Sequence, residues 1–347
     1  MHEYVGAIHI HSVFSDGSGE IPDIAVHAEE SGLDFIMISD HNTLRGLEEG
    51  YEKYYGNTLV LIGCEINDRK NQNHYLAFGI NKTISTRLPA KEYVKKINEA
   101  GGFGFIAHPH EKRSSMKEHP AYPWTEWDCE DYTGIEIWNH MSEWMEGLTE
   151  QNKFNYFIHP LKSIIAPPEE TLKVWDQVNL KRKVVGIGGV DAHAHKVNML
   201  GFFEVEVFPY KVLFKSVRTH ILTDEKLSCG EGEEASEGKR IIYSALREGR
   251  CFVSNSYHGD ASGFRFICKG PVGEYGMGDA LPYEENLRLW VTLPKGKGEL
   301  RLIRNGEKIA ENEDFEGGFR VRESGVYRVE VYLNNNAWIF SNHIRIH

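Results

Sequence analysis

Short apolar runs alternate with stretches of helical periodicity over the first two thirds of the chain, and this alternation limits the possible folds more than any other feature. The runs are rich in Val, Ile and Phe and are bounded by Gly, Asp or Asn, as buried strands are. They are Val5–Ile10, Phe35–Ser39, Leu59–Gly63, Phe103–Ala107, Gly134–Trp138 and Val184–Val190. Two of the segments between them, Glu20–Ser31 and Pro89–Gly102, carry apolar residues at helical spacing. Repeated alternation of strand and helix predicts parallel β/α units, which form either a barrel or a doubly wound sheet.

The pattern changes in the last third of the chain. An acidic, Gly-rich loop is expected over Leu222–Gly238, followed by a helix over Arg240–Glu248. From about Ser262 onward, strands with alternating apolar and polar residues are separated by turns. The expected strands are Gly263–Cys268, Asn286–Leu293, Gly298–Arg304, Gly318–Glu323, Gly325–Tyr332 and Trp338–Ile346. The expected domains are an α/β unit over residues 1–255 and a small antiparallel β-sandwich over residues 262–347.

Composition and charge exclude several classes of protein. Hydrophobic residues make up 41% and charged residues 26% of the 347 residues, which is typical of a globular chain, and no apolar run is long enough to span a bilayer. Acidic residues outnumber basic ones by 51 to 39, and the resulting net charge of −12 disfavours a nucleic-acid partner. The five cysteines lack CxxC spacing and the first residues resemble no secretion leader, so a cytoplasmic location is expected. The expected partner is a small-molecule substrate, with no nucleic acid and no membrane.

Histidine and carboxylate side chains follow the predicted strands at the point where each strand ends. They are His9 and His11, Asp40 and His41, Glu65, His108, and Asp191 and His193. Because the carboxyl ends of parallel strands meet at one rim, we expect these side chains to face a common pocket. Imidazole and carboxylate ligands without thiolate suit Zn²⁺, Mn²⁺ or iron, and their number exceeds what one tetrahedral ion takes.

The structural roles that these residues could have instead of metal binding differ from residue to residue. The chain has seventeen histidines, so one His-x-His pair is expected by chance, whereas five strand ends that each carry His, Asp or Glu are not. If these were ordinary core residues, several costly polar groups would be buried at one rim without a common partner. For Asp16 the alternative is a turn or a helix cap, and for Asp40 we favour a hydrogen-bond acceptor that supports a ligand.

Taken in order, these residues stand in motifs that resemble those of the PHP (polymerase and histidinol phosphatase) superfamily. The motifs are His9-Ile10-His11 with Asp16, Ser39-Asp40-His41-Asn42, Gly63-Cys64-Glu65, His74 before an apolar run, Ala107-His108-Pro109 and Val190-Asp191-Ala192-His193. The resemblance covers roughly residues 5–255. In addition, Gly134–Asn139 and Trp338–Asn342 are similar to strings of the CehA/McbA-type metallohydrolases.

The resemblance implies a distorted (β/α)7 TIM-like barrel, the PHP fold, that holds two or three divalent ions, either Mn, Zn or Fe. Carried over residue by residue, it implies three ligand sets, which are His9, His11, Glu65 and Asp191; Glu65, His74 and His108; and Asp16, His41 and His193. His74 enters only through the resemblance, and Asp16 stands where several members of the superfamily have histidine.

Such a centre implies hydrolysis. Water that bridges two cations is hydroxide near neutral pH and attacks phosphorus or a carbonyl carbon, so the catalytic residues are expected to be Asp191, Glu65 and His193. The leading hypothesis is a metal-dependent phosphoesterase that acts on a small phosphorylated metabolite. The first alternative is a carbamate, ester or amide hydrolase of the CehA/McbA type with the same metal centre. The second alternative is a non-catalytic, metal-stabilised binding module.

Five residues close to the predicted ligands are candidates for binding the substrate. They are Asn139, Arg113, Lys112, His110 and His195. Lys112 and Arg113 would supply positive charge to a phosphate, although a solvated loop charge is the favoured reading of each. His110 and His195 would reach the substrate or act as a general acid, and the alternative is that they are simply neighbours of ligands.

Overall fold

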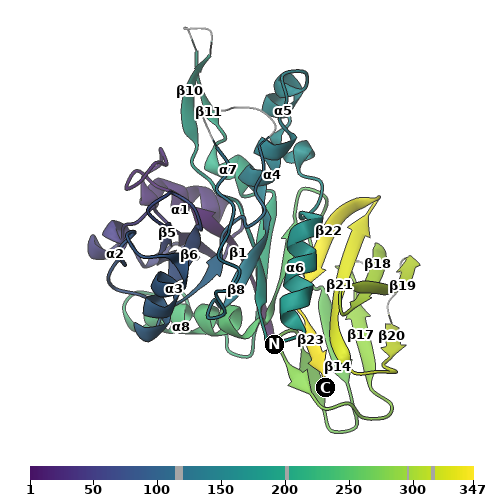
Figure 1. Ribbon diagram of the computed structural model, residues 1–347. Helices are drawn as coiled ribbons and strands as arrows, with labels where there is room; N and C mark the ends of the chain where they lie inside the picture. Colours follow the sequence, from purple (N-terminus) through teal and green to yellow (C-terminus); the bar gives the residue numbers. More distant parts are fainter. Residues whose placement is uncertain (114–119, 200–202, 295–296, 314–316) are drawn as a thin grey trace.

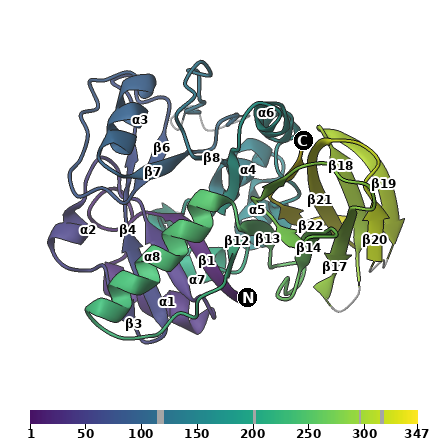
Figure 2. The same cartoon turned by 90° about the horizontal axis from the view of Figure 1, so that it is seen from below.

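The computed structural model describes residues 1–113, 120–199, 203–294, 297–313 and 317–347. Within these residues the strands form sheets of 12, five, four and two strands. An α/β region and a β-rich region lie side by side (Figures 1 and 2). Among the described helices, none combines the length and the apolar character that crossing a bilayer requires.

The first sheet of the α/β region is built around β1. In spatial order its strands here are β13 (Cys251–Asn255), β12 (Val217–Thr223), β1 (His2–Ile10), β2 (Phe35–Ile38), β4 (Thr58–Ile62) and β3 (Tyr54–Tyr55). The strands β1, β2 and β4 are parallel, as the β/α pattern predicts, whereas β12 and β13 are antiparallel additions. The parallel strands therefore bring their carboxyl ends to one edge.

The second sheet has five strands. They are, in spatial order, β5 (Cys64–Ile66), β6 (Tyr75–Phe78), β7 (Phe103–Ile106), β8 (Gly134–Asn139) and β9 (Val185–Gly189). The strands β7, β8 and β9 are parallel, while β6 runs antiparallel to both of its neighbours. All six strands predicted for the α/β region occur, and within this second sheet β5 and β6 are additional.

The expected closed barrel is wrong, because the two sheets remain separate. At one seam Gly63 joins β4 directly to β5, and His41 forms a single bridge with Glu65. At the other seam the backbone N–H of Val190 donates to the carbonyl of Ile8, and Ile10, the last residue of β1, forms a single bridge with Ala192. The fold is thus a mixed α/β arrangement in which isolated bridges stand where a barrel would have continuous ladders.

The helices cover the outer faces of these sheets and fill the connections. They are α1 (Ile21–Glu30), α2 (Arg45–Glu48), α3 (Ala90–Glu99), α4 (His140–Gly147), α5 (Lys153–Ile158), η1 (Pro160–Ser163), α6 (Glu169–Asn179), α7 (Tyr210–Leu213) and α8 (Glu233–Glu248). The predicted helices over 20–31 and 89–102 are α1 and α3. Helix α8 begins well before Arg240, inside the expected acidic loop, because Glu233 and Glu234 lie in its first turn, where negative charge is favourable.

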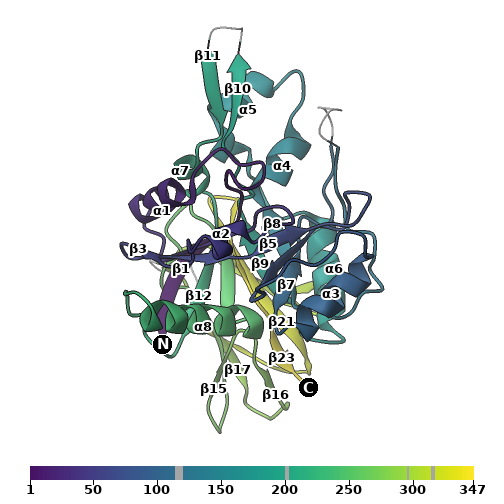
Figure 3. The ribbon, with the colours of Figure 1, turned by 90° about the vertical axis from the view of Figure 1, so that its left-hand side faces the viewer.

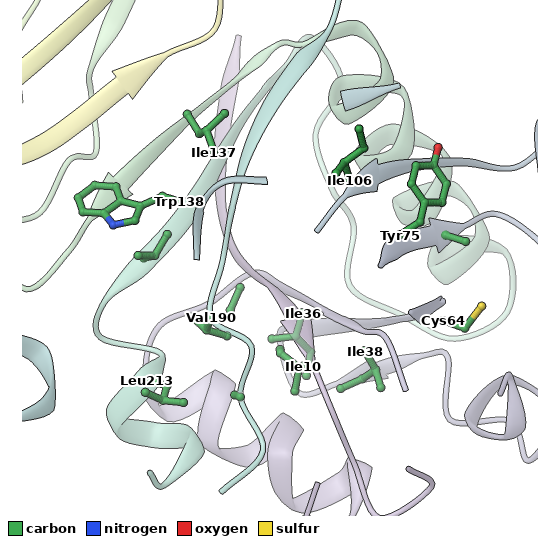
Figure 4. Packing of buried hydrophobic residues seen from close by; sticks show 14 of the residues in the cluster. Ile10, Ile36, Ile38, Cys64, Tyr75, Ile106, Ile137, Trp138, Val190 and Leu213 are labelled. Carbon is green, nitrogen blue, oxygen red and sulfur yellow. The ribbon is translucent and has the colours of Figure 1, made fainter. Parts of the chain in front are cut away.

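Both faces of the central strands are buried, which explains why their sequences are apolar throughout. In β2, Ile36 and Ile38 belong to one hydrophobic cluster, which includes α1, and Phe35 and Met37 belong to another, which includes α8. Figure 4 shows side chains of the first cluster, among them Ile36 and Ile38 close to Ile10 of β1. Full burial of such a side chain stabilises the fold by about 1.5–3 kcal/mol.

The β-rich region continues the first sheet. Strand β13 pairs with β22 (Asn336–Ser341), which starts the outer part made of β21 (Gly325–Leu333), β23 (Ile344–Ile346), β16 (Ala280–Leu281), β18 (Glu299–Arg304) and β19 (Glu307–Glu313). A four-stranded sheet contains β15 (Glu274–Gly276), β14 (Arg265–Lys269), β17 (Arg288–Thr292) and β20 (Gly317–Arg320). Apolar side chains of both sheets form one cluster, as in a sandwich. The division at 255/262 stays a prediction, because the larger sheet crosses it.

A hairpin of β10 (His195–Met199) and β11 (Phe203–Val207) was not expected. It projects from the α/β region at the same end as α5 (Figures 1 and 3). Its first strand begins two residues after the predicted ligand His193, so the hairpin starts at the rim where the ligands gather.

Candidate metal centre

Three of the predicted ligands lie at strand ends with an unusual backbone. His9, His108 and Asp191 have φ values of 68°, 28° and 53°, in a region that residues other than glycine rarely adopt. At His9 the register between β1 and β2 shifts, so the regular ladder is interrupted at this ligand. Strained positions of this kind cluster at functional sites, where the surrounding structure holds them in place.

The buried carboxylate of Glu65 is the centre of the cluster. Its Oε2 lies 2.9 Å from His9 Nε2, 3.2 Å from His11 Nε2 and 3.5 Å from His41 Nδ1. Its Oε1 lies 2.5 Å from His74 Nδ1 and 3.3 Å from His108 Nε2. A single carboxylate therefore contacts imidazoles that come from the ends of several strands, with one oxygen turned to each side.

Two further carboxylates extend the cluster on the side of His11. Asp191 Oδ1 lies 3.4 Å from Nε2 of both His9 and His11 and 3.6 Å from His193 Nδ1. Asp16 contacts His193 at 3.3 Å, and His11 and His41 at 3.6 Å each. The structure thus brings together all nine residues predicted as ligands.

The ligand atoms form four overlapping groups in which every atom lies within 4.8 Å of the others. The groups are His11, Asp16, His41 and His193; His9, Glu65 and His108; His9, His11 and Asp191; and His41, Glu65 and His74. The predicted third set recurs here with His11 added. The predicted set of Glu65, His74 and His108 does not form such a group among the described residues, because His74 groups with His41 and His108 with His9. The assignment of ligands to individual ions stays a prediction.

The chemistry of this donor set fits divalent cations. Among the described residues, both ring nitrogens of His11, Nε2 of His74 and Nδ1 of His108 are buried without a hydrogen-bond partner. Buried polar atoms are costly when nothing binds them, and a cation that accepts their lone pairs removes this cost. Imidazole with carboxylate is also the ligand mixture that Zn²⁺, Mn²⁺ and iron take.

The charges in the cluster oppose the effect of burial on each pKa. Burial favours the neutral form of Glu65, but the surrounding histidines, His9 first, hold the pKa of this carboxyl well below its usual range. The pKa of Asp191 is likewise low, because His9, His11 and His193 together outweigh burial. For His41 burial prevails and lowers the pKa to about 4. The carboxylates therefore stay ionised at neutral pH, as metal ligands must be.

Supporting side chains hold the ligands in place. Asp40, which we expected to support a ligand, accepts hydrogen bonds from the Ser12 N–H and hydroxyl at 2.7 and 2.6 Å and from the Ser15 hydroxyl at 2.6 Å. These bonds fix the loop that carries Asp16. Sequence reasoning gave no role to Glu136, whose carboxylate forms a hydrogen bond with His9. The sequence feature that could have revealed it is a carboxylate inside an apolar strand, between Ile135 and Ile137.

The candidate substrate-binding residues differ in their surroundings. Lys112 is exposed and pairs with Glu170 at 2.9 Å, whereas Arg113 pairs with the buried Glu111 at 2.5 Å. A cavity of about 20 Å³ lies next to His108, and its lining includes Glu111. Both basic side chains are therefore already matched by carboxylates.

The other three candidates lie closer to the ligands or to aromatic rings. His110 contacts the Thr171 hydroxyl at 2.9 Å and stacks on Trp127. His195 stacks on His193 with ring centroids 4.8 Å apart. Asn139 is buried beside Asp191, with its Nδ2 3.4 Å from Oδ2. Of the three, Asn139 is thus integrated into the cluster itself.

Comparison with known proteins places this cluster in a family context. Residues 7–121 match the family model of the PHP domain. The matched segment contains every predicted ligand except Asp191 and His193. An uncharacterized protein of Methanocaldococcus jannaschii is 33% identical over 99 residues, which are 28% of this chain and 56% of that protein's length.

Two solved structures were also similar. A two-domain protein of Bacteroides vulgatus, which contains a predicted PHP-like metal-dependent phosphoesterase, is 14% identical with a TM-score of 0.46, over 99% of this chain and 95% of the other. An amidohydrolase from Chromobacterium violaceum is 12% identical with a TM-score of 0.31, over 54% of this chain and 87% of the other.

Proposed function

We propose that this protein is a metal-dependent hydrolase, and specifically a phosphoesterase that acts on a small phosphorylated metabolite. The observation that carries the proposal is the Glu65 cluster, in which nine imidazole and carboxylate side chains converge within a chain whose residues 7–121 match the PHP domain. The CehA/McbA subgroup, two or three ions of Mn, Zn or Fe, and a cytoplasmic location belong to this proposal.

The residues would divide the work as follows. His9, His11, Glu65 and Asp191 would hold one ion, and Glu65 would share a second with His74 and His108. Bound divalent ions supply a coordinated water of lowered pKa and positive charge that offsets the charge developing on the substrate oxygens. Glu65 and Asp191 stay ionised and keep the histidines oriented.

The ring of His193 is oriented by a backbone contact at one of its nitrogens. Its Nδ1 lies 3.0 Å from the carbonyl oxygen of Asp191, which can accept a hydrogen bond from the Nδ1–H, so Nε2 is the ring nitrogen that faces the cluster. Nε2 faces Asp16 at 3.3 Å. We therefore assign His193 the task of binding an ion or moving a proton through Nε2.

A second candidate function is the hydrolysis of a carbamate, an ester or an amide. It is favoured by the state of Lys112 and Arg113, which already pair with Glu170 and Glu111 and so offer a phosphate little uncompensated charge. A neutral substrate would need no such cation.

The test measures release of inorganic phosphate by protein reconstituted with Mn²⁺ or Zn²⁺. The substrates are sugar phosphates, nucleotides, nucleoside bisphosphates and cyclic phosphates, and a parallel panel contains p-nitrophenyl esters and aryl carbamates. The Asp191→Asn variant is the blank, and Asp224→Asn, at an exposed position, is the matched control. Phosphate release that is lost only in Asp191→Asn supports the phosphoesterase. Turnover of the parallel panel alone supports the second function, and metal binding without any turnover supports a binding module.

A further inference from the structure

The carboxylate of Glu136 connects the ends of three strands directly beneath the ligand cluster. The side chain is fully buried on β8. Its Oε1 lies 2.9 Å from His9 Nδ1, at the end of β1. Its Oε2 accepts the backbone N–H of His108, just after β7, at 2.8 Å and the Asn139 Nδ2–H at 2.9 Å. Within the described part of the chain, these hydrogen bonds thus go to predicted ligands or to Asn139, which lies beside Asp191.

These contacts determine which nitrogen of His9 faces the cluster. A carboxylate accepts but does not donate, so Glu136 Oε1 holds a proton on His9 Nδ1, and Nε2 can give its lone pair to an ion when the ring is neutral. The opposite nitrogen, Nε2, then points at Glu65 Oε2, 2.9 Å away, and at Asp191 Oδ1, 3.4 Å away. A histidine ligand whose other nitrogen donates to a carboxylate is fixed in orientation and made more basic.

The neighbouring strand leaves room for this arrangement. A Cβ atom at Gly189, the last residue of β9, would lie 1.8 Å from Glu136 Oε1 and 3.0 Å from the Cβ of His9. Any larger residue at position 189 would therefore push the carboxylate away from the imidazole. The absence of a side chain there keeps the hydrogen bond intact.

We propose that Glu136 is a positioning residue for the metal centre. It holds the proton of His9 on Nδ1 and at the same time fixes the backbone of His108, so that one carboxylate aligns two ligands of the group formed by His9, Glu65 and His108. The inference rests on the metal centre of the proposed function, but it does not depend on which bond is hydrolysed.

The isosteric variant Glu136→Gln separates this role from simple packing. An amide has one acceptor oxygen, whereas the site needs acceptors at both positions. If the amide nitrogen of the new side chain faces His9, its N–H and the Nδ1–H of His9 are two donors without an acceptor. Otherwise the proton of His9 must move to Nε2, and Nε2 then has no lone pair for an ion. If it faces His108, it meets the backbone N–H and the Asn139 amide. Either orientation disturbs one ligand, although the volume of the side chain is unchanged.

The experiment measures the affinity and stoichiometry of Zn²⁺ and Mn²⁺ by competition with a chromophoric chelator. We expect Glu136→Gln to bind about 10- to 100-fold more weakly than the unmodified protein, as is typical when a supporting partner of a ligand is lost. Glu143→Gln is the matched control, because this buried carboxylate accepts from Trp138, Ile165 and Ala166 and hydrogen-bonds to no histidine among the described residues. Its affinity should be unchanged.

Gly189→Ala provides a second variant that keeps the charge of Glu136 but displaces its oxygen, and it should show the same direction of change. In ¹⁵N-histidine spectra of the Zn²⁺-loaded protein, His9 should carry its proton on Nδ1. Folded Glu136→Gln with unchanged affinity overturns the role of Glu136 and leaves the metal centre standing. If Glu136→Gln does not fold, unchanged affinity in Gly189→Ala overturns it. An unmodified protein that binds no ion overturns both the inference and the proposed function.

Discussion

Replacing Arg328 with Met should destabilise the junction between the two regions of the protein. Arg328 lies on β21 and is buried against α6, where its Nε and Nη2 donate to the two carboxylate oxygens of Asp176 at 2.7 and 2.9 Å. Its Nη1 donates to Glu330 at 2.7 Å. Methionine keeps much of the apolar stem but removes all three hydrogen bonds and the positive charge.

The expected loss follows from the groups that stay behind. The side chains of Arg328 and Asp176 are only 3% and 4% exposed, so water cannot replace the lost bonds. His343 still contacts Asp176 at 2.9 Å, and Tyr332 still donates to Glu330 at 3.2 Å, which offsets part of the cost. Removing one partner of a buried ion pair costs about 3–5 kcal/mol. With an unfolding entropy of about 2 cal/mol/K per residue, about 4 kcal/mol corresponds to a fall of about 5 °C in Tm.

Thermal and urea unfolding followed by circular dichroism measure this loss. Arg304→Met is the control, since the pair of Arg304 with Glu323 lies at the surface and its removal should change stability by less than about 1 kcal/mol. Adding Asp176→Asn to Arg328→Met should restore part of the stability, because it removes the uncompensated charge. The reasoning is refuted if Arg328→Met is as stable as the unmodified protein, or if the second change lowers stability further.

Three further predictions concern the pH dependence of stability, the removal of metal, and the hydrogen bonds between Asn342 and Gly186 of β9. Burial alone would raise the pKa of Asp176, but hydrogen bonds from His343 and Arg328 lower it to about 2. The stability that the ionised carboxylate contributes is therefore present above pH 4 and is lost as the pH falls toward 2. Acid unfolding monitored by fluorescence should show this loss of stability, and Asp176→Asn should reduce the pH dependence. Removal of divalent ions with a chelator should lower the Tm of the unmodified protein but not that of Asp191→Asn, and an equal response would contradict the metal assignment. Asn342 accepts from the Gly186 N–H at 2.7 Å and donates to its carbonyl at 2.8 Å. Asn342→Ala should therefore lower the free energy of unfolding, measured in urea, by about 1–3 kcal/mol. An unchanged free energy of unfolding would show that these two hydrogen bonds do not stabilise the fold.

The sequence predicted those parts of the fold that depend on local pattern. The strands of the α/β region are apolar throughout because both faces are buried, and this makes runs such as Phe35–Ser39 easy to recognise. The hairpin of β10 and β11 and the polar strand β19 were missed, because exposed strands lack a continuous apolar signal. The closed barrel failed for a different reason, since it depends on hydrogen bonds across seams that no local pattern encodes.

The candidate site was more predictable than the fold around it. Ligands such as His9 and Asp191 stand at strand ends, and parallel topology brings such ends together whatever the details of the ladder. His74 has no such position, because it precedes its strand, and only the resemblance placed it. Glu136 was missed because its role depends on a contact with β1, far away in the sequence. Partners of ligands are set by tertiary packing, which composition and spacing do not reveal.

The continuity of the large sheet from β13 to β22 has a consequence for how the protein is made. Strand β1 carries His9 but pairs with β12, which is synthesised much later, and β13 gains its outer neighbour only when residues 336–341 have emerged. Such long-range pairing is slow, because the chain loses the entropy of closing large loops before the stabilising contacts form. A nascent chain that stops before β22 presents a bare strand edge, the kind of surface on which chains associate. The sheet that carries His9 is thus completed only by strands from the last part of the chain.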